Sequence, residues 1–192
     1  MSRFYIPLKK GLKKTAPDFS KIKTISGASC CYCLFYMNEY EGQLIFSNLK
    51  SINGHDTFRS AFARSENITS VSFPELEVVK GTNAAVGAFS GCPKLTTASF
   101  SKLYNVGNKG SYAAMNVFFS SCTSLQSIYF SAFTSEYASW NVNNLDRMLS
   151  GVTGCTVHFP SNLQSVIGSH SYVTAGFGGT NTTVLFDLPA TT

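Results

Sequence analysis

The sequence predicts an α/β solenoid of about six to seven coils, each built from about 27–30 residues that form a short strand and a short helix. Three observations predict it. One phenylalanine recurs at nearly constant spacing, the residues before it alternate in polarity, and a second block carries apolar residues at helical spacing. The chain has 192 residues and is only 13% charged, so it can bury one sizeable core. We expect residues 19–192 to form this solenoid and residues 1–18 to form a basic N-terminal arm or cap.

The recurring phenylalanine ends each apolar stretch, and its first three intervals are each 27 residues long. These anchors are Phe19, Phe46, Phe73, Phe100, Phe130, Phe159 and Phe186. The alternation just before each anchor, as in "SIYF" at 127–130, predicts a short strand. One such unit cannot bury its apolar face alone, so the units are expected to stack.

A second block precedes each anchor after the first and is expected to form a short helix. Its second, fifth and sixth positions are mostly apolar, as in Phe58, Ala61 and Phe62. Positions i, i+3 and i+4 share one face of a helix. The blocks begin at Cys30, Thr57, Ala84, Ala114, Asn144 and Tyr172.

The positive charge lies at one end of the chain. Seven lysine and arginine side chains against Asp18 give the segment 1–23 a charge of +6, and the segment 24–192 sums to −1. This disfavours a nucleic-acid partner, because no basic and aromatic stripe continues into the body. The arm is either a solvated terminus or a docking arm for an acidic partner. We read no secretory signal in it, and no apolar run approaches the roughly 18–20 residues of a membrane span.

Two segments carry a family resemblance: "AFSGCPKLTTASF" (Ala88–Phe100) and "FFSSCTSLQSIYF" (Phe118–Phe130). With "FPELEVVKG" one unit earlier, they resemble the BspA-like leucine-rich repeats of bacteria. The match covers about residues 19–187, although cysteine occupies its usual column only at Cys92 and Cys122. The C-terminal "TVHFPSNLQSVIG" also looks like repeats in large proteins of gut bacteria and their phages. The resemblance implies a right-handed leucine-rich-repeat solenoid used for adhesion or protein contact.

The cysteine cluster at Cys30, Cys31 and Cys33 invites a metal interpretation, but a structural zinc site usually needs a second pair of ligands. We favour free thiols over a disulfide or a metal site and expect no cofactor. Cys92 and Cys122 share one column and are expected to act as small apolar spacers.

An enzyme is disfavoured because the few histidines fall on different coils. His55 adjoins Asp56, while His158 and His170 lie in other units, so no Ser–His–Asp arrangement is indicated. The glycines at 176–179 lack the lysine of a phosphate-binding loop.

Surface columns and insertions indicate the binding face. The outward column of the strands contains Tyr129 and His158, and a neighbouring column is rich in Ser and Thr, which is either solvent cover or a polar recognition face. Insertions at 108–112 and 134–141 supply aromatic residues, and insertions in solenoids often mark the binding face. Trp140 could instead fill a gap under its loop. The predicted binding face comprises Tyr112, Tyr129, Tyr137, Trp140 and His158.

The C-terminal coil is expected to leave "TVLF" (183–186) as an open strand edge. We therefore predict self-association, or docking in a larger assembly, through this end.

Together these features favour a non-enzymatic interaction module: a structural or adhesion protein of a phage virion, in its tail or fibre, made in the host cytoplasm. The alternative is a bacterial surface adhesion protein that binds a host protein or a surface glycan. A third reading, an enzyme using His55 and Asp56 or the cysteine cluster at Cys30, has the least support.

Overall fold

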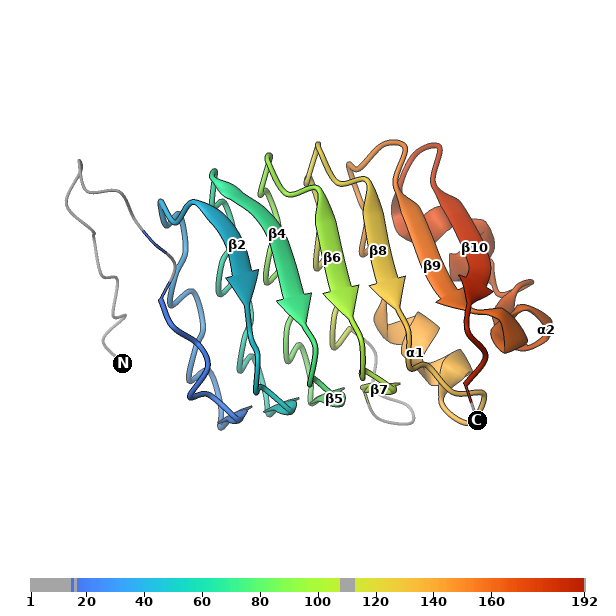
Figure 1. Ribbon diagram of the computed structural model, residues 1–192, viewed down its shortest axis with the longest axis horizontal. Coiled ribbons are helices and arrows are strands. Elements are labelled where there is room, and N and C mark those ends of the chain that lie inside the picture. The colour runs from blue at the N-terminus through green and yellow to red at the C-terminus, as the bar shows by residue number, and fades with distance from the viewer. Residues whose placement is uncertain (1–14, 16, 108–112, 192) are drawn as a thin grey trace.

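Two parallel β-sheets organise the chain, which the computed structural model describes at residues 15, 17–107 and 113–191. The longer sheet has the strand order β10 (Thr183–Leu188), β9 (Thr156–Pro160), β8 (Ser127–Phe130), β6 (Thr97–Phe100), β4 (Ile68–Phe73) and β2 (Gly42–Ile45). The shorter sheet has the order β1 (Thr24–Ser26), β3 (Ser51–Asn53), β5 (Val78–Lys80) and β7 (Asn105–Val106). Figure 1 looks onto the longer sheet, with the shorter one along its lower edge. The chain therefore alternates between two sheets as it advances.

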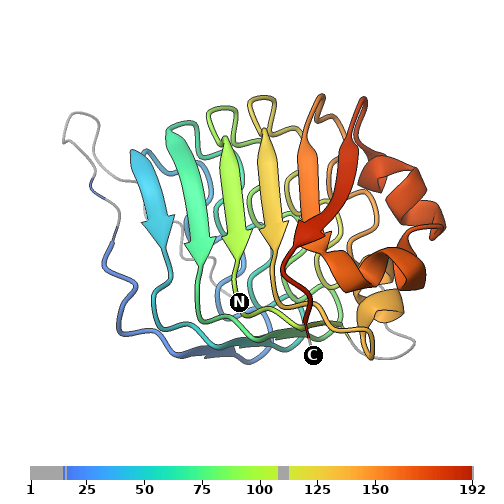
Figure 2. The same ribbon diagram turned by 45° about the vertical axis from the view of Figure 1, so that its right-hand side comes forward.

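The helices are short and gather at the C-terminal end of the two sheets (Figures 1 and 2). They are α1 (Ala138–Asn144), α2 (Gln164–Ile167) and α3 (Ser171–Thr174), with 3-10 turns η1 (Ser161–Leu163) and η2 (Gly176–Gly178). The outer face of the longer sheet is free of them. The predicted N-terminal arm or cap, residues 1–18, falls almost entirely outside the described part and stays a prediction.

The pairing of the strands follows the register of the repeat. Phe73 pairs with Phe100, its counterpart one unit along, and Phe100 pairs with Phe130 even though that unit is longer. Phe159 pairs with Phe186 in the last two strands. The longer units therefore absorb their extra residues outside the sheet without shifting its register.

The anchor phenylalanines form a continuous stack through the core, as the sequence predicts. The rings of Phe46 and Phe73 lie 4.7 Å apart between centroids, and those of Phe73 and Phe100 lie 5.2 Å apart, each pair with nearly parallel planes. The stack begins at Phe19 and ends at Phe186. Each such pair contributes about 0.5–1.5 kcal/mol beyond the burial of its area. The stack thus fixes how each unit sits on the next.

The shorter sheet was not predicted. Its strands centre on an apolar column that includes Ile25, Ile52 and Val79, which lie buried. Each strand is only two or three positions long. Such a short segment carries too little alternation to be recognised as a strand from sequence.

The predicted helix is absent from five of the six blocks, where the chain forms successive turns: those that begin at Cys30, Thr57, Ala84 and Ala114, and the one that begins at Asn144, where α1 ends. The N–H groups of Phe58, Ser60 and Phe62 donate to carbonyls of the next unit, at 2.6, 2.9 and 2.8 Å. An α-helix would direct all of these groups along its own axis. Left-handed backbone at every fourth position, as at Ser60 and Arg64, also interrupts any helix.

A side-chain amide ends the shorter sheet where a fifth strand would otherwise pair. Asn141 of α1 is fully buried; its Oδ1 accepts the N–H of Val106 at 2.7 Å, and its Nδ2 donates to the carbonyl of Tyr104 at 2.8 Å. These are the groups that a neighbouring strand would satisfy. The helix α1 therefore takes the place of a strand at the β7 edge.

We expect Gly81→Ala to destabilise the protein more than Gly27→Ala. Both glycines have left-handed φ, +114° and +101°, so alanine costs about 1–3 kcal/mol of backbone strain at either site. A Cβ at Gly81 would also overlap the backbone of Gly54, whereas none lies near Gly27, which adds about 1–3 kcal/mol at Gly81. Urea denaturation measures both variants, and equal losses would contradict the close packing of the units.

We expect Asn141→Ala to lower the free energy of unfolding by about 1–3 kcal/mol for each backbone group it leaves unpaired. The matched control is Asn162→Ala. Asn162 makes the same two kinds of bond, to the carbonyl and N–H of Thr191, but is exposed, so we expect a loss below about 0.5 kcal/mol. Similar losses for both variants would contradict the role of Asn141.

Candidate functional site

The outer face of the longer sheet presents two rows of side chains, because alternate residues of each strand point outward. The pairing of the strands confirms the two predicted columns. One row comprises Gln43, Ser70, Thr97, Ser127, Thr156 and Thr183. The other row comprises Ile45, Ser72, Ser99, Tyr129, His158 and Leu185. No described helix covers these rows (Figure 2).

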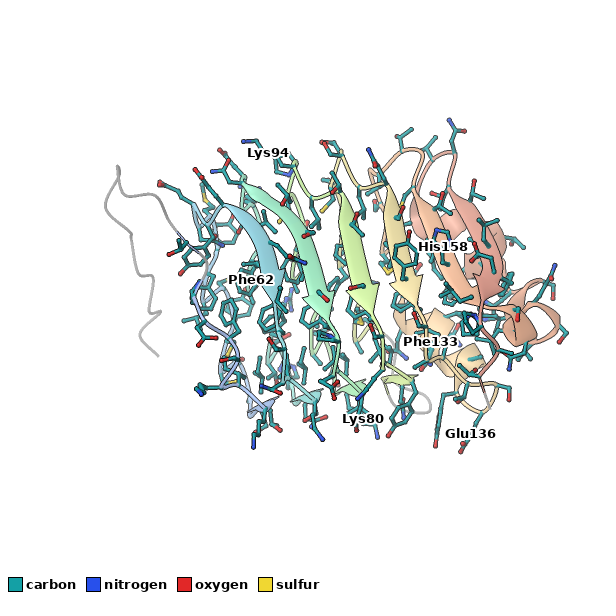
Figure 3. All side chains as sticks on the ribbon, viewed as in Figure 1. Phe62, Lys80, Lys94, Phe133, Glu136 and His158 are labelled. Carbon is teal, nitrogen blue, oxygen red and sulfur yellow. The ribbon has the colours of Figure 1, made fainter. Side chains whose placement is uncertain are left out.

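A polar–aromatic cluster, here called the Tyr–His–Asp patch, occupies the C-terminal half of this face. The rings of Tyr129 and His158 stack with centroids 4.5 Å apart and planes 10° apart. Nδ1 of His158 lies 2.9 and 3.0 Å from the two carboxylate oxygens of Asp187. The patch therefore joins the three strands β8, β9 and β10 through their side chains (Figure 3 labels His158).

Asp187 fixes the orientation of the imidazole. Because the carboxylate accepts at Nδ1, it favours a proton on that nitrogen and holds the ring in place. The His158 side chain keeps 15% of its surface exposed and Asp187 keeps 46%. The stacked rings and the carboxylate therefore offer a pre-ordered set of aromatic, donor and acceptor groups to a contacting surface.

The N-terminal half of the face carries smaller outward side chains on β4 and β6, and none of its outward residues is charged. The hydroxyl of Ser99 donates to that of Ser72 at 3.0 Å, and both side chains are half-buried. Ile45 lies at the far end of the row and is 45% exposed. The face thus changes from small hydroxyls to bulky aromatic groups along its length.

Tyr137 does not lie on this face. Its ring packs on Tyr104, 5.9 Å away, just before β7 of the shorter sheet, and a hydrogen bond with Glu136 raises the pKa of its phenol. Figure 3 shows the neighbouring Glu136 at the lower edge of the molecule, whereas His158 lies on the face of the longer sheet. The structure therefore brings Tyr129 and His158 together and places Tyr137 apart.

The two remaining members of the predicted face cannot be placed with it. Trp140 belongs to α1, but its side chain is outside the described set, and Tyr112 is itself outside the described residues.

The other histidines have local structural contacts. The carboxylate of Asp56 lies 3.1 Å from both His55 and Arg59, within one turn. Nδ1 of His170 accepts the N–H of Tyr172 at the start of α3, and burial lowers the pKa of His170. Each histidine thus belongs to a separate environment.

The cysteines divide into an exposed group and a buried group. Cys30 is exposed, Cys31 and Cys33 are partly buried, and Cys92, Cys122 and Cys155 are buried. Burial raises the pKa of Cys31 and of Cys155 to about 12 in each case. Within residues 17–107 and 113–191, His, Cys, Asp and Glu side chains form no group of three or more that could hold a metal ion.

Cys92 and Cys122 do more than fill space. The Cys92 thiol donates to the carbonyl of Phe62 at 3.4 Å, and the Cys122 thiol donates to that of Phe89 at 3.1 Å. Hydrogen bonding with Cys92, together with burial, raises the pKa of Cys122. These thiols therefore satisfy carbonyls that face the core between units.

Asp187 is the one member of the patch that the sequence did not predict. Asp187 lies two positions after Leu185, which the repeat places on the outer face. If the strand had been expected to continue past Phe186, alternation would have predicted that the Asp187 side chain also points outward. The pairing of β9 and β10 shifts its register between Phe186 and Leu188, around Asp187. A register shift of this kind has no signature in the repeat.

Comparisons with family models, with curated proteins and with solved structures gave no match. Among the helices described, none has the length and apolar character needed to cross a bilayer.

We expect alkylation with iodoacetamide at mildly alkaline pH to modify Cys30 first, Cys33 more slowly, and Cys92, Cys122 and Cys155 only after unfolding. Burial excludes the reagent from the last three, and the thiolate is the reactive species. Peptide mass spectrometry, with and without urea, measures the order. Rapid labelling of Cys122 in the folded protein would contradict its position between the units.

Proposed function

We propose that the chain is a leucine-rich-repeat solenoid that acts as a non-enzymatic interaction module, associated with the tail or fibre of a phage virion. The regular register between strands and the phenylalanine stack support the solenoid. The BspA-like segments around Cys92 and Cys122 support the family, and the C-terminal repeats support the phage setting.

The observation that carries the proposal is the uncovered outer face of the longer sheet. Two rows of side chains cross six parallel strands there, and the Tyr–His–Asp patch stands at one end of them. Tyrosine is enriched at interface hot spots because its ring gives large contact area and its hydroxyl gives a hydrogen bond. A broad face of this kind suits contact with another macromolecule.

The face also has little net charge. Along the two rows of β4, β6 and β8 the outward residues are Ser, Thr and Tyr, and the only carboxylate of the patch, Asp187, is paired with His158. Recognition here would rest on aromatic contact and neutral hydrogen bonds, and so would depend weakly on salt.

We expect the chain to be recovered in purified virions of its source phage, with the outer face protected. Hydroxyl-radical footprinting compares the isolated chain with the particle-bound chain, and oxidation of Tyr129 and His158 should fall in the particle. Tyr137, on another side of the molecule, is the internal control.

Recovery in cell envelopes instead of virions would favour the bacterial adhesion alternative. Equal oxidation of Tyr129 in the free and bound states would remove the outer face as the contact surface, whichever setting holds.

A further inference from the structure

The terminal strand β10 of the longer sheet has one open edge. It pairs with β9 on one side, and no other described residue pairs with its opposite side. The N–H of Thr183 donates to the carbonyl of Cys155 at 2.9 Å, toward β9. Backbone groups alternate sides along a strand, so those of Val184 and Phe186 point to the open edge. Unpaired groups of this kind form a template for another strand.

The same edge leaves the end of the apolar core partly uncovered. Val184 and Phe186 are half-buried, whereas their counterparts one unit earlier, Val157 and Phe159, are fully buried. A hollow of about 500 Å³ lies beside them, and its lining is mixed: Val173 and Thr174 of α3, Thr182, and residues of the α2 segment from Gln164 to Ser169. An occupant of this edge therefore meets both backbone groups and apolar side chains.

We propose that a second copy of this chain occupies the edge, with the two β10 strands antiparallel about a two-fold axis that passes at Leu185. This arrangement sets Val184 opposite the partner's Phe186, and Phe186 opposite the partner's Val184. The backbone groups of these pairs face each other, so they form the hydrogen-bonded pairs of an antiparallel ladder. Both half-buried core ends are covered in one step.

The outward side chains of β10 are self-complementary in the same register. Leu185 is 38% exposed and meets the partner's Leu185 on the axis. Thr183 lies nearest the partner's Asp187, whose carboxylate keeps its contact with His158, so no like charges oppose each other. Cross-strand pairs of this kind contribute favourably to a sheet. Because β10 is complementary to a second, antiparallel β10, we favour a second copy of the chain over an unrelated partner.

A two-fold contact also gives a closed assembly of two copies, because each copy uses its one β10 edge. Pairing of β10 with the β2 edge of another copy would be heterologous, and such contacts generate open filaments unless a ring forms. The dimer does not require a ligand on the outer face, so the proposal can fail without affecting the proposed function.

The test compares charge variants of the full chain by sedimentation equilibrium. The unmodified chain of 20.8 kDa should sediment as a dimer. Leu185→Lys and Leu185→Glu each place like charges together on the axis, and each should weaken the dimer about tenfold or more. A mixture of the two variants should form the heterodimer, which tagged pull-down of one variant by the other detects.

The matched control is Ile45→Lys, at a position of the same row on β2 that is 45% exposed against 38% for Leu185, and it should leave the dimer intact. Circular dichroism checks that each variant folds, as expected for outward side chains. A monomeric unmodified chain, a dimer insensitive to Leu185→Lys, or variants that do not recombine would each overturn the proposal. Concentration-dependent polymers that Ile45→Lys blocks would replace it with a head-to-tail contact.

Discussion

The stacking of one phenylalanine of each unit on the next is the constraint on which the rest of the structure depends. A ring separation near 5 Å matches the spacing of hydrogen-bonded strands, about 4.8 Å, so ring stacking and strand pairing hold the same register. The left-handed backbone at Ser60 is stabilised by a hydrogen bond from its N–H to the next unit. At Gly81 the previous unit packs so closely that only a residue without a side chain fits. Local strain is therefore offset between units and not within them.

The sequence predicted the features that depend on period and missed those that depend on backbone direction. Anchors such as Phe73 and Phe100 identify the strands of the longer sheet because apolar identity repeats at a fixed interval. The turns from Thr57 onward were predicted as helices, because apolar residues at i, i+3 and i+4 suit either a helix or a series of turns. What distinguishes them is the destination of each N–H group, which no residue type specifies.

The candidate site shows the same division. Alternation placed Tyr129 and His158 on one face, and the repeat aligned them one strand apart. Tyr137 was grouped with them because insertions often lie together, but its segment folds into the start of α1 beside Tyr104. The direction taken by an inserted segment depends on tertiary contacts, such as those of the Asn141 amide, that leave no periodic trace.

The Asn141 amide ends the shorter sheet at β7. The parts of the chain before and after α1 should therefore differ in how readily a whole repeat unit can be inserted or deleted. Between β3 and β5, one duplicated unit would meet the same ring stack and the same ladder partners on both sides. Beyond α1 it would find a longer sheet to extend but no shorter one. Gain or loss of whole units during evolution should therefore concentrate on the N-terminal side of α1, while the C-terminal portion keeps a fixed size.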